Sequence, residues 1–167
     1  MLIREGQFFP ASYDTATKVI SAAVCAIPVV VLLATRNIAG VAVSALAAGI
    51  AYAWSPRGYR VAEQSIFVKR LIGEACIPLR GLREARATTP DDFKWCIRVF
   101  GVGGLFGYYG VFRTSKLGTS HWYLTSRSRA VVVITLNKTS LVSPDDQEGF
   151  LAAIQAAVPT GSLNDSI

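Results

Sequence analysis

The chain has 167 residues, 51% of them hydrophobic and 17% charged, and its 17 Lys and Arg against 11 Asp and Glu give a net charge of +6. Its three cysteines lack CxxC spacing and it holds a single histidine, so the sequence implies no metal site and no cofactor. The length allows one compact domain beside a membrane segment and excludes a second globular domain.

Residues 19–54 are the most apolar stretch. The runs Val19 to Thr35 and Ile38 to Trp54 carry no charge, and only Arg36 and Asn37 separate them. As a helix, each run spans about 25 Å, slightly less than a hydrocarbon core of about 30 Å. Neither run has a polar face, and Trp54 falls where an interfacial aromatic is expected, so the stretch predicts a transmembrane helical hairpin.

Two alternatives to the membrane hairpin stay open, a buried helical hairpin of a soluble protein and a cleaved signal peptide. Glu5 and Asp14 argue against the signal peptide, because residues 1–18 lack its short basic start. We expect this cytoplasmic lead-in to form either a strand that returns to the later domain or an interfacial anchor. Asp14 or Thr15 is the expected cap of the first helix.

Small residues recur every fourth position of the second run, at Gly40, Ser44 and Ala48. This spacing lets helix backbones approach closely, so these residues are predicted to pack against the first helix or against another copy of the chain. Pro28 is predicted to kink the first helix.

Basic residues place the ends of the predicted hairpin. One lies in the connecting loop, Arg36, whereas four follow the second run within residues 57–70. By the positive-inside rule, both termini and the later domain are predicted on the cytoplasmic side of the membrane.

The part after the hairpin, residues 55–167, carries 14 Lys and Arg against nine Asp and Glu. Such an excess attracts anionic headgroups, and Lys69, Arg70 and Arg113 are the candidate lipid contacts. The same excess is also explained by membrane topology alone. The basic residues are dispersed without a recognised motif, so nucleic acid is not a predicted partner.

Residues 59–64 and 65–71 alternate as strands do, and residues 72–74 have the composition of a hairpin turn. Pro78 predicts that the strand over residues 75–79 is an edge strand or ends there. Residues 82–88 are ambiguous between helix and strand. Four more strands are predicted over residues 110–116, 121–126, 130–136 and 140–143, with AVVVITL the strongest.

Two segments combine a hydroxyl residue, a proline and two acids, TPDD from Thr89 and SPDD from Ser143. Both predict helix starts, with Ser143 as the cap of a C-terminal helix. That helix would bury one face, made by Phe150, Leu151, Ile154 and Val158. Residues 159–167 are predicted to be a flexible tail.

The most unusual stretch after the apolar runs is RVFGVGGLFGYYGVF, residues 98–112. It lacks the lysine and hydroxyl of a phosphate loop. We expect a glycine-rich loop that folds tightly against a sheet, or that contacts the membrane interface or a partner. The side chains proposed for that contact are Phe100, Leu105, Phe106, Tyr108 and Tyr109.

Together with KLG, HWYLTS, AVVVIT and SPDDQEGF, this stretch resembles the bacterial PH-domain families of small membrane proteins, in which a membrane hairpin precedes a pleckstrin-homology-like domain. The resemblance implies an α+β membrane protein. Its PH-like domain, residues 57–158, would be a strongly bent antiparallel sheet of about seven strands capped by a C-terminal amphipathic helix. The basic loop with which eukaryotic relatives bind phosphoinositides is not evident.

No catalytic constellation emerges from the sequence. His121 is a lone histidine in a predicted strand start, typical of a packing or hydrogen-bonding residue, and the acid pairs are explained by helix starts. We therefore expect a non-enzymatic scaffold that binds a protein or itself. An anionic-lipid sensor, and an accessory subunit of a membrane transporter or enzyme complex, are the alternatives.

Overall fold

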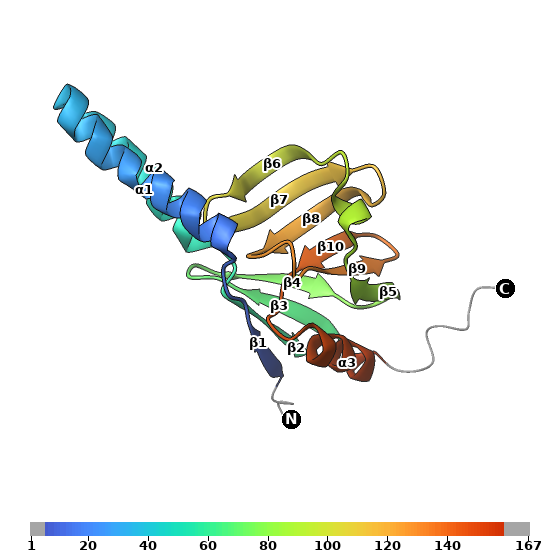
Figure 1. Ribbon diagram of the computed structural model, residues 1–167. Coiled ribbons are helices and arrows are strands. Elements are labelled where there is room, and N and C mark those ends of the chain that lie inside the picture. Colours follow the sequence, from blue (N-terminus) through green and yellow to red (C-terminus); the bar gives the residue numbers. More distant parts are fainter. Residues whose placement is uncertain (1–5, 159–167) are drawn as a thin grey trace.

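The computed structural model describes residues 6–158, and the predicted tail 159–167 lies outside them. Two long helices lead away from a pair of β-sheets, and a C-terminal helix packs at the opposite side (Figure 1). The elements are β1 (Gln7–Pro10), α1 (Thr15–Thr35), α2 (Ile38–Trp54), β2 (Gly58–Ala62), β3 (Ser65–Lys69), β4 (Glu74–Pro78), β5 (Leu82–Ala87), the 3₁₀ helix η1 (Pro90–Phe93), β6 (Ile97–Gly104), β7 (Gly107–Thr114), β8 (Gly118–Leu124), β9 (Val131–Thr135), β10 (Thr139–Val142) and α3 (Gln147–Ala157).

The strands form two sheets, where the sequence predicts one sheet of about seven strands. The first has the order β1-β2-β3-β4 and is antiparallel; the second has the order β5-β9-β10-β8-β7-β6, with β10 parallel to β8. The prediction of a single antiparallel sheet is therefore wrong. The first sheet stops at β4, which ends at Pro78 as expected of an edge strand, because proline has no N–H for a further ladder bond.

The lead-in residues settle into the first sheet. β1 pairs with β2 in a register that places Phe8 opposite Arg60 and Phe9 opposite Tyr59. Phe9 is buried and meets Phe150 of α3 edge-on, with ring centroids 5.1 Å apart. Of the two expectations for this segment, the returning strand is the one that the structure bears out.

The helix starts follow the expected capping chemistry. The Asp14 carboxylate accepts a hydrogen bond of 2.7 Å from Thr17 N–H, so α1 begins at Thr15, four residues before the apolar run. The Asn37 side chain caps α2 by accepting from Gly40 N–H at 3.1 Å. Within the described residues, one segment is long and apolar enough to cross a bilayer, Thr15–Ala34, and 11% of its most apolar window is buried. α2, with 17 residues, is a shorter apolar helix.

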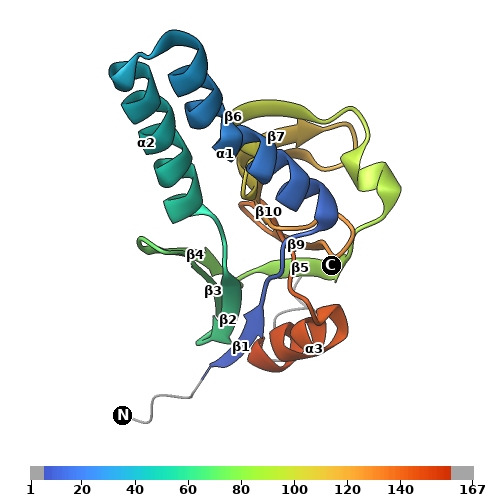
Figure 2. The same ribbon diagram turned by 60° about the vertical axis from the view of Figure 1, so that its left-hand side comes forward.

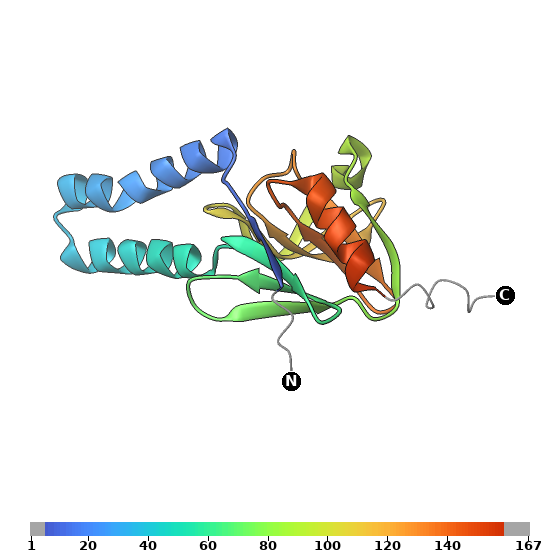
Figure 3. The same cartoon turned by 90° about the horizontal axis from the view of Figure 1, so that it is seen from below.

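The two helices diverge toward the sheets, as Figures 2 and 3 show from two directions. Along α2, the predicted small-residue face is partly buried at Gly40, Ser44 and Ala48. A Cβ added at Gly40 would lie 3.3 Å from a methyl group of Val31 on α1, so this glycine permits the close approach. The Ser44 hydroxyl donates to Gly40 O at 2.8 Å, which satisfies it within its own helix.

The core lies between the two sheets and under α3. In β9, Val131 and Val133 join the cluster around Tyr59 and Phe150, while Val132 joins a second cluster on the other face of the sheet. Both faces of this strand are thus buried, which explains its unbroken apolar run. In α3 the predicted apolar face is confirmed, with Phe150 and Ile154 fully buried and Leu151 and Val158 packed against the same cluster.

The predicted cap of α3 is wrong. The helix begins at Gln147, and the cap is Asp146, whose carboxylate accepts from Gly149 N–H at 2.9 Å. Ser143 is instead fully buried, and its hydroxyl oxygen accepts from Thr125 N–H at 2.8 Å. This serine satisfies backbone groups where β8 ends, a need that is visible only after the strands are assembled.

The TPDD segment does start a helix, the single turn η1, which covers the second cluster. Trp122 stacks on Phe112, with centroids 4.2 Å apart, and meets Phe93 edge-on at 5.5 Å. Asp92 is fully buried and accepts two hydrogen bonds from the Arg86 guanidinium, at 2.7 and 3.0 Å. Those bonds, more than any other contact, hold the pKa of Asp92 well below its usual range.

Replacing Asp92→Asn should therefore lower the free energy of unfolding at pH 7 by about 3 kcal/mol, because Arg86 loses its buried partner. The folded pKa lies below the unfolded value of about 3.9, so this stabilisation is fully present above the unfolded pKa and is lost as the pH falls through the folded one. Urea titrations of detergent-solubilised protein carrying Trp54→Phe and Trp95→Phe, followed by the fluorescence of the remaining Trp122 at several pH values, should show a weaker acid dependence in the variant.

The matched control is Asp91→Asn, which removes a neighbouring acid whose side chain is 60% exposed and paired with Lys94. Little change is expected from it, because exposed ion pairs contribute little. Equal urea midpoints for wild type and Asp92→Asn would show that the buried pair does not stabilise this part of the fold.

Candidate functional site

The glycine-aromatic run forms a β-hairpin of β6 and β7, which we call the glycine hairpin, and the prediction of a loop is wrong. Gly101 and Gly110 lie opposite each other with φ of +114° and +130°. A Cβ at Gly101 would come within 2.2 Å of Tyr109 O, and one at Gly110 within 2.3 Å of Phe100 O. The glycines thus permit a cross-strand approach that no other residue allows, although glycine is usually depleted in strands.

The tip of this hairpin, Leu105 and Phe106, lies between the wide ends of α1 and α2 (Figure 3). Phe106 N–H donates to Ser21 Oγ of α1 at 2.8 Å, and Phe106 O accepts from Ser55 Oγ, just after α2, at 2.5 Å. The Phe106 ring meets Tyr52 of α2 edge-on, with centroids 5.1 Å apart. One residue therefore binds both helices through its backbone and its side chain.

Two further contacts fix the end of α2 to the sheets. The Tyr109 hydroxyl donates a hydrogen bond to Ala51 O at 2.5 Å. Burial of this hydroxyl raises the pKa of Tyr109 to about 12. In the turn between β3 and β4, Ile72 N–H donates to Ala53 O at 3.3 Å. Both sheets thus contact the last turn of α2, which accepts these bonds with the carbonyls that a helix end leaves free.

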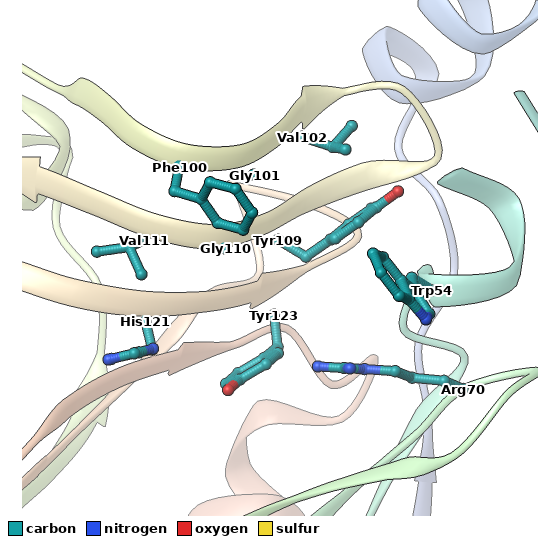
Figure 4. A pocket seen from close by; sticks show the side chains of 10 residues that line it. All are labelled: Trp54, Arg70, Phe100, Gly101, Val102, Tyr109, Gly110, Val111, His121 and Tyr123. Carbon is teal, nitrogen blue, oxygen red and sulfur yellow. The ribbon is translucent and has the colours of Figure 1, made fainter. Parts of the chain in front are cut away.

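Beside this junction is a groove of about 500 Å³. Its walls come from the end of α2, the β3–β4 turn and the strands β6, β7 and β8, as Figure 4 shows. The lining residues are Trp54, Arg70, Phe100, Gly101, Val102, Tyr109, Gly110, Val111, His121 and Tyr123. Aromatic and aliphatic side chains predominate, so the groove suits an apolar ligand or segment.

Arg70 is the cation of the groove. Its guanidinium carbon lies 5.3 Å from the centre of the Tyr123 ring, a cation–π contact, and Trp54 lines the groove beside it (Figure 4). Its Nε is buried and has no hydrogen-bond partner among the described residues. A guanidinium among apolar walls is suited to donate hydrogen bonds from its terminal nitrogens to an anionic or carbonyl group of a ligand.

His121 lines the groove from β8 and is half-buried. Burial, with a smaller effect from the Lys138 charge, lowers the pKa of His121, so the imidazole is neutral at pH 7. In the described part of the chain, no group of three or more His, Cys, Asp or Glu side chains could hold a metal ion.

The chain from β2 to α3 matches the family model described as Bacterial PH domain, over residues 57–158. The match covers more than half of the sequence. The chain belongs to the bacterial PH domain family. No curated protein and no solved structure matches it. The matched range, here called the PH domain, starts just after α2 and leaves out β1, α1 and α2. Membership of this family indicates a binding module rather than an enzyme.

The aromatic residues singled out from the sequence have different places in the PH domain. Phe100 and Tyr109 line the groove, while Leu105 and Phe106 form the tip that meets the helices. Tyr108 lies on another side, where the Arg127 guanidinium carbon is 4.2 Å from its ring centre. One hairpin thus supplies both the groove wall and the helix junction.

The three predicted headgroup contacts do not form one patch. Lys69 makes an ion pair with Glu74, and the adjacent Arg70 enters the groove. Arg113 is paired with Ile97 at the end of the glycine hairpin far from the helices. Of the three, only Arg70 stands at the groove of the PH domain.

Among the residues of this junction and groove that sequence reasoning missed are Ser21, Ser55 and Tyr123. The two serines read as minor interruptions of apolar or turn segments, and Tyr123 as one residue of an ordinary strand. A polar residue at the start of an apolar helix is a weak signal, because its partner, Phe106, is far away in the sequence.

Replacing Phe106→Ala should loosen the junction by about 1 kcal/mol, the typical contribution of an aromatic pair, because the edge-on contact with Tyr52 is lost. Hydrogen exchange of the last turn of α2 should become about fivefold faster. The measurement is exchange followed by mass spectrometry on the full chain in detergent.

The control is Leu136→Ala, an exposed apolar residue in the turn between β9 and β10. It should leave exchange in α2 unchanged. If Phe106→Ala also leaves α2 unchanged, the hydrogen bonds between the backbone of residue 106 and the Ser21 and Ser55 side chains hold the junction without the ring.

Proposed function

We propose that the chain is a membrane-anchored, non-catalytic binding module. Its PH domain would engage a protein partner, or a second copy of the chain, at the cytoplasmic face of a bacterial inner membrane. The observation that carries this proposal is the groove beside the last residue of α2, which has apolar walls and holds one guanidinium, that of Arg70.

Anchoring is supported by the two apolar helices and by the strand pairing that joins the start of α1 to the end of α2. β1 precedes α1 and β2 follows α2, and the two strands are paired side by side. The start of α1 and the end of α2 are therefore held on the same side of any membrane that the helix pair crosses. The cluster of basic residues after α2 then favours the cytoplasmic side for the PH domain.

A partner in the same membrane fits this groove best. The groove is formed partly by Trp54 at the end of α2, so a ligand there would sit at the level of the helix ends. A juxtamembrane segment of another membrane protein, with an apolar stretch and an acidic or carbonyl group for Arg70, matches the lining.

Arg70 also favours a second candidate function, recognition of an anionic lipid. A phosphate group at the guanidinium, with an acyl chain along the aromatic wall, would satisfy the same lining. The separation of Arg113 from Arg70 argues for one headgroup contact rather than a broad basic surface.

Anchoring predicts that the protein stays in membranes after alkaline carbonate extraction. In a background with Ser at Cys25 and Cys96, the exposed Cys76 of β4 should react with an impermeant maleimide only when the cytoplasmic face is open. In the same background with Cys76→Ser, Arg36→Cys at the far end of the helix pair should react only from the opposite face. Release by carbonate, or labelling of both sites from one face, would contradict two crossings.

Filling the groove tests the binding function. Val111→Trp places a large side chain in the groove, and Leu136→Trp adds the same side chain in the β9–β10 turn. With a photo-crosslinker at Tyr123 in intact membranes, we expect protein adducts that disappear in Val111→Trp and persist in Leu136→Trp.

The mass of the adduct separates the candidates. An adduct of twice the chain mass indicates self-association, another protein mass indicates a separate partner, and a lipid mass supports the second candidate. Protein adducts that survive in Val111→Trp would overturn the groove as the binding site.

A further inference from the structure

The part of the helix pair that extends beyond the PH domain is short. The glycine hairpin makes hydrogen bonds to α1 at Ser21 and to α2 at Ala51. Residues 22–35 and 38–50 remain, which at about 1.5 Å per residue extend roughly 20 Å. A hydrocarbon core is about 30 Å thick, so these segments alone do not cross it.

Two other elements lie beside the helices in the part that would make up the difference of about 10 Å between helix length and core thickness. β6 runs beside the first turns of α1 in Figures 1 and 2, and a Cβ at Gly104 would lie 3.1 Å from Ile20 Cδ1. The β3–β4 turn lies against the end of α2, through the hydrogen bond from Ile72 to Ala53. When the helices enter a bilayer, these two elements reach its near boundary with them.

Both elements expose large apolar side chains. In β6, Val99 is 61% exposed and Phe100 is 76% exposed; in the β3–β4 turn, Leu71 is 56% and Ile72 is 63% exposed. We call these four residues the apolar rim. Soluble surfaces seldom gather such side chains at two neighbouring places, and each is adjacent to a cation, since Arg70 precedes Leu71 and Arg98 precedes Val99.

We propose that the apolar rim is immersed at the boundary between headgroups and acyl chains of the bilayer that holds α1 and α2. The rim would supply the depth that the helices lack, and Arg98 would extend toward anionic headgroups. The inference rests on the proposed membrane anchoring. The alternative occupant of the β6 edge, a second copy pairing strand to strand, is an outcome of the test.

Tryptophan reporters in the full-length chain test the depth. The background is Trp54→Phe with Trp95→Phe, which keeps the fully buried Trp122 as an internal reference. Phe100→Trp and Ile72→Trp report on the rim, and Leu136→Trp reports on an exposed turn away from the helices (Figure 1). The protein is reconstituted in phosphatidylcholine and phosphatidylglycerol vesicles with or without bromine on the upper acyl chains.

Bromine should quench the added tryptophan at 100 and at 72 by more than half, and should leave the one at 136 unchanged. A separate chain that keeps Trp54 and carries Trp95→Phe reports on anchoring itself. If Trp54 is quenched while both rim reporters are not, the inference is overturned and anchoring stands.

Two other results also overturn the inference. If no reporter is quenched, anchoring fails together with the rim. If the rim reporters are shielded from bromine and a cysteine pair at Val99 links two copies, the β6 edge is a dimer interface. Because all three added tryptophans replace exposed apolar residues, circular dichroism should confirm that each variant folds.

Discussion

The arrangement of helices and sheets depends on the hydrogen bonds that the backbone of one turn, at the tip of the glycine hairpin, makes to its neighbours. The hairpin tip brings Phe106 N–H and C=O into the space between two apolar helices, where unpaired polar groups are costly. Ser21 and Ser55 provide the acceptor and the donor, and the Tyr13 hydroxyl, 2.8 Å from Ser55 Oγ, extends the network. Because hydrogen bonds have preferred directions, this junction sets the orientation of the helices relative to the PH domain.

The groove and the apolar rim share a residue, Phe100, and both lie at the helix junction. A ligand in the groove would therefore contact Phe100, a side chain that is also proposed to be immersed at the bilayer boundary. Movement of β6 relative to the bilayer would alter the groove wall, and a ligand in the groove would alter how deeply the apolar rim is immersed. Tight coupling of this kind follows from building a site on an edge strand, which one neighbouring strand alone holds in place.

Local patterns predicted much of the fold, because their causes lie within a few residues. Asp14 and Thr89 mark helix starts, Pro78 marks an edge, and the valines of β9 mark a strand buried on both faces. The glycine hairpin escaped prediction because glycine is usually a breaker, and its need here arises from contact between two strands. The groove joins Trp54, Arg70 and Tyr123 from separate elements, and only the assembled chain brings them together.

The pairing of β1 with β2 has a consequence for the order in which the chain is assembled. Gln7 meets Val61 across a sequence separation that contains both helices. Such a distant pairing closes late, because the cost of closing a long loop must be met first. During synthesis, β1 emerges long before its partner and stays unpaired until α1, α2 and β2 have followed it. A change that kept α1 and α2 apart would also keep β1 from β2, and would leave an unpaired strand edge exposed.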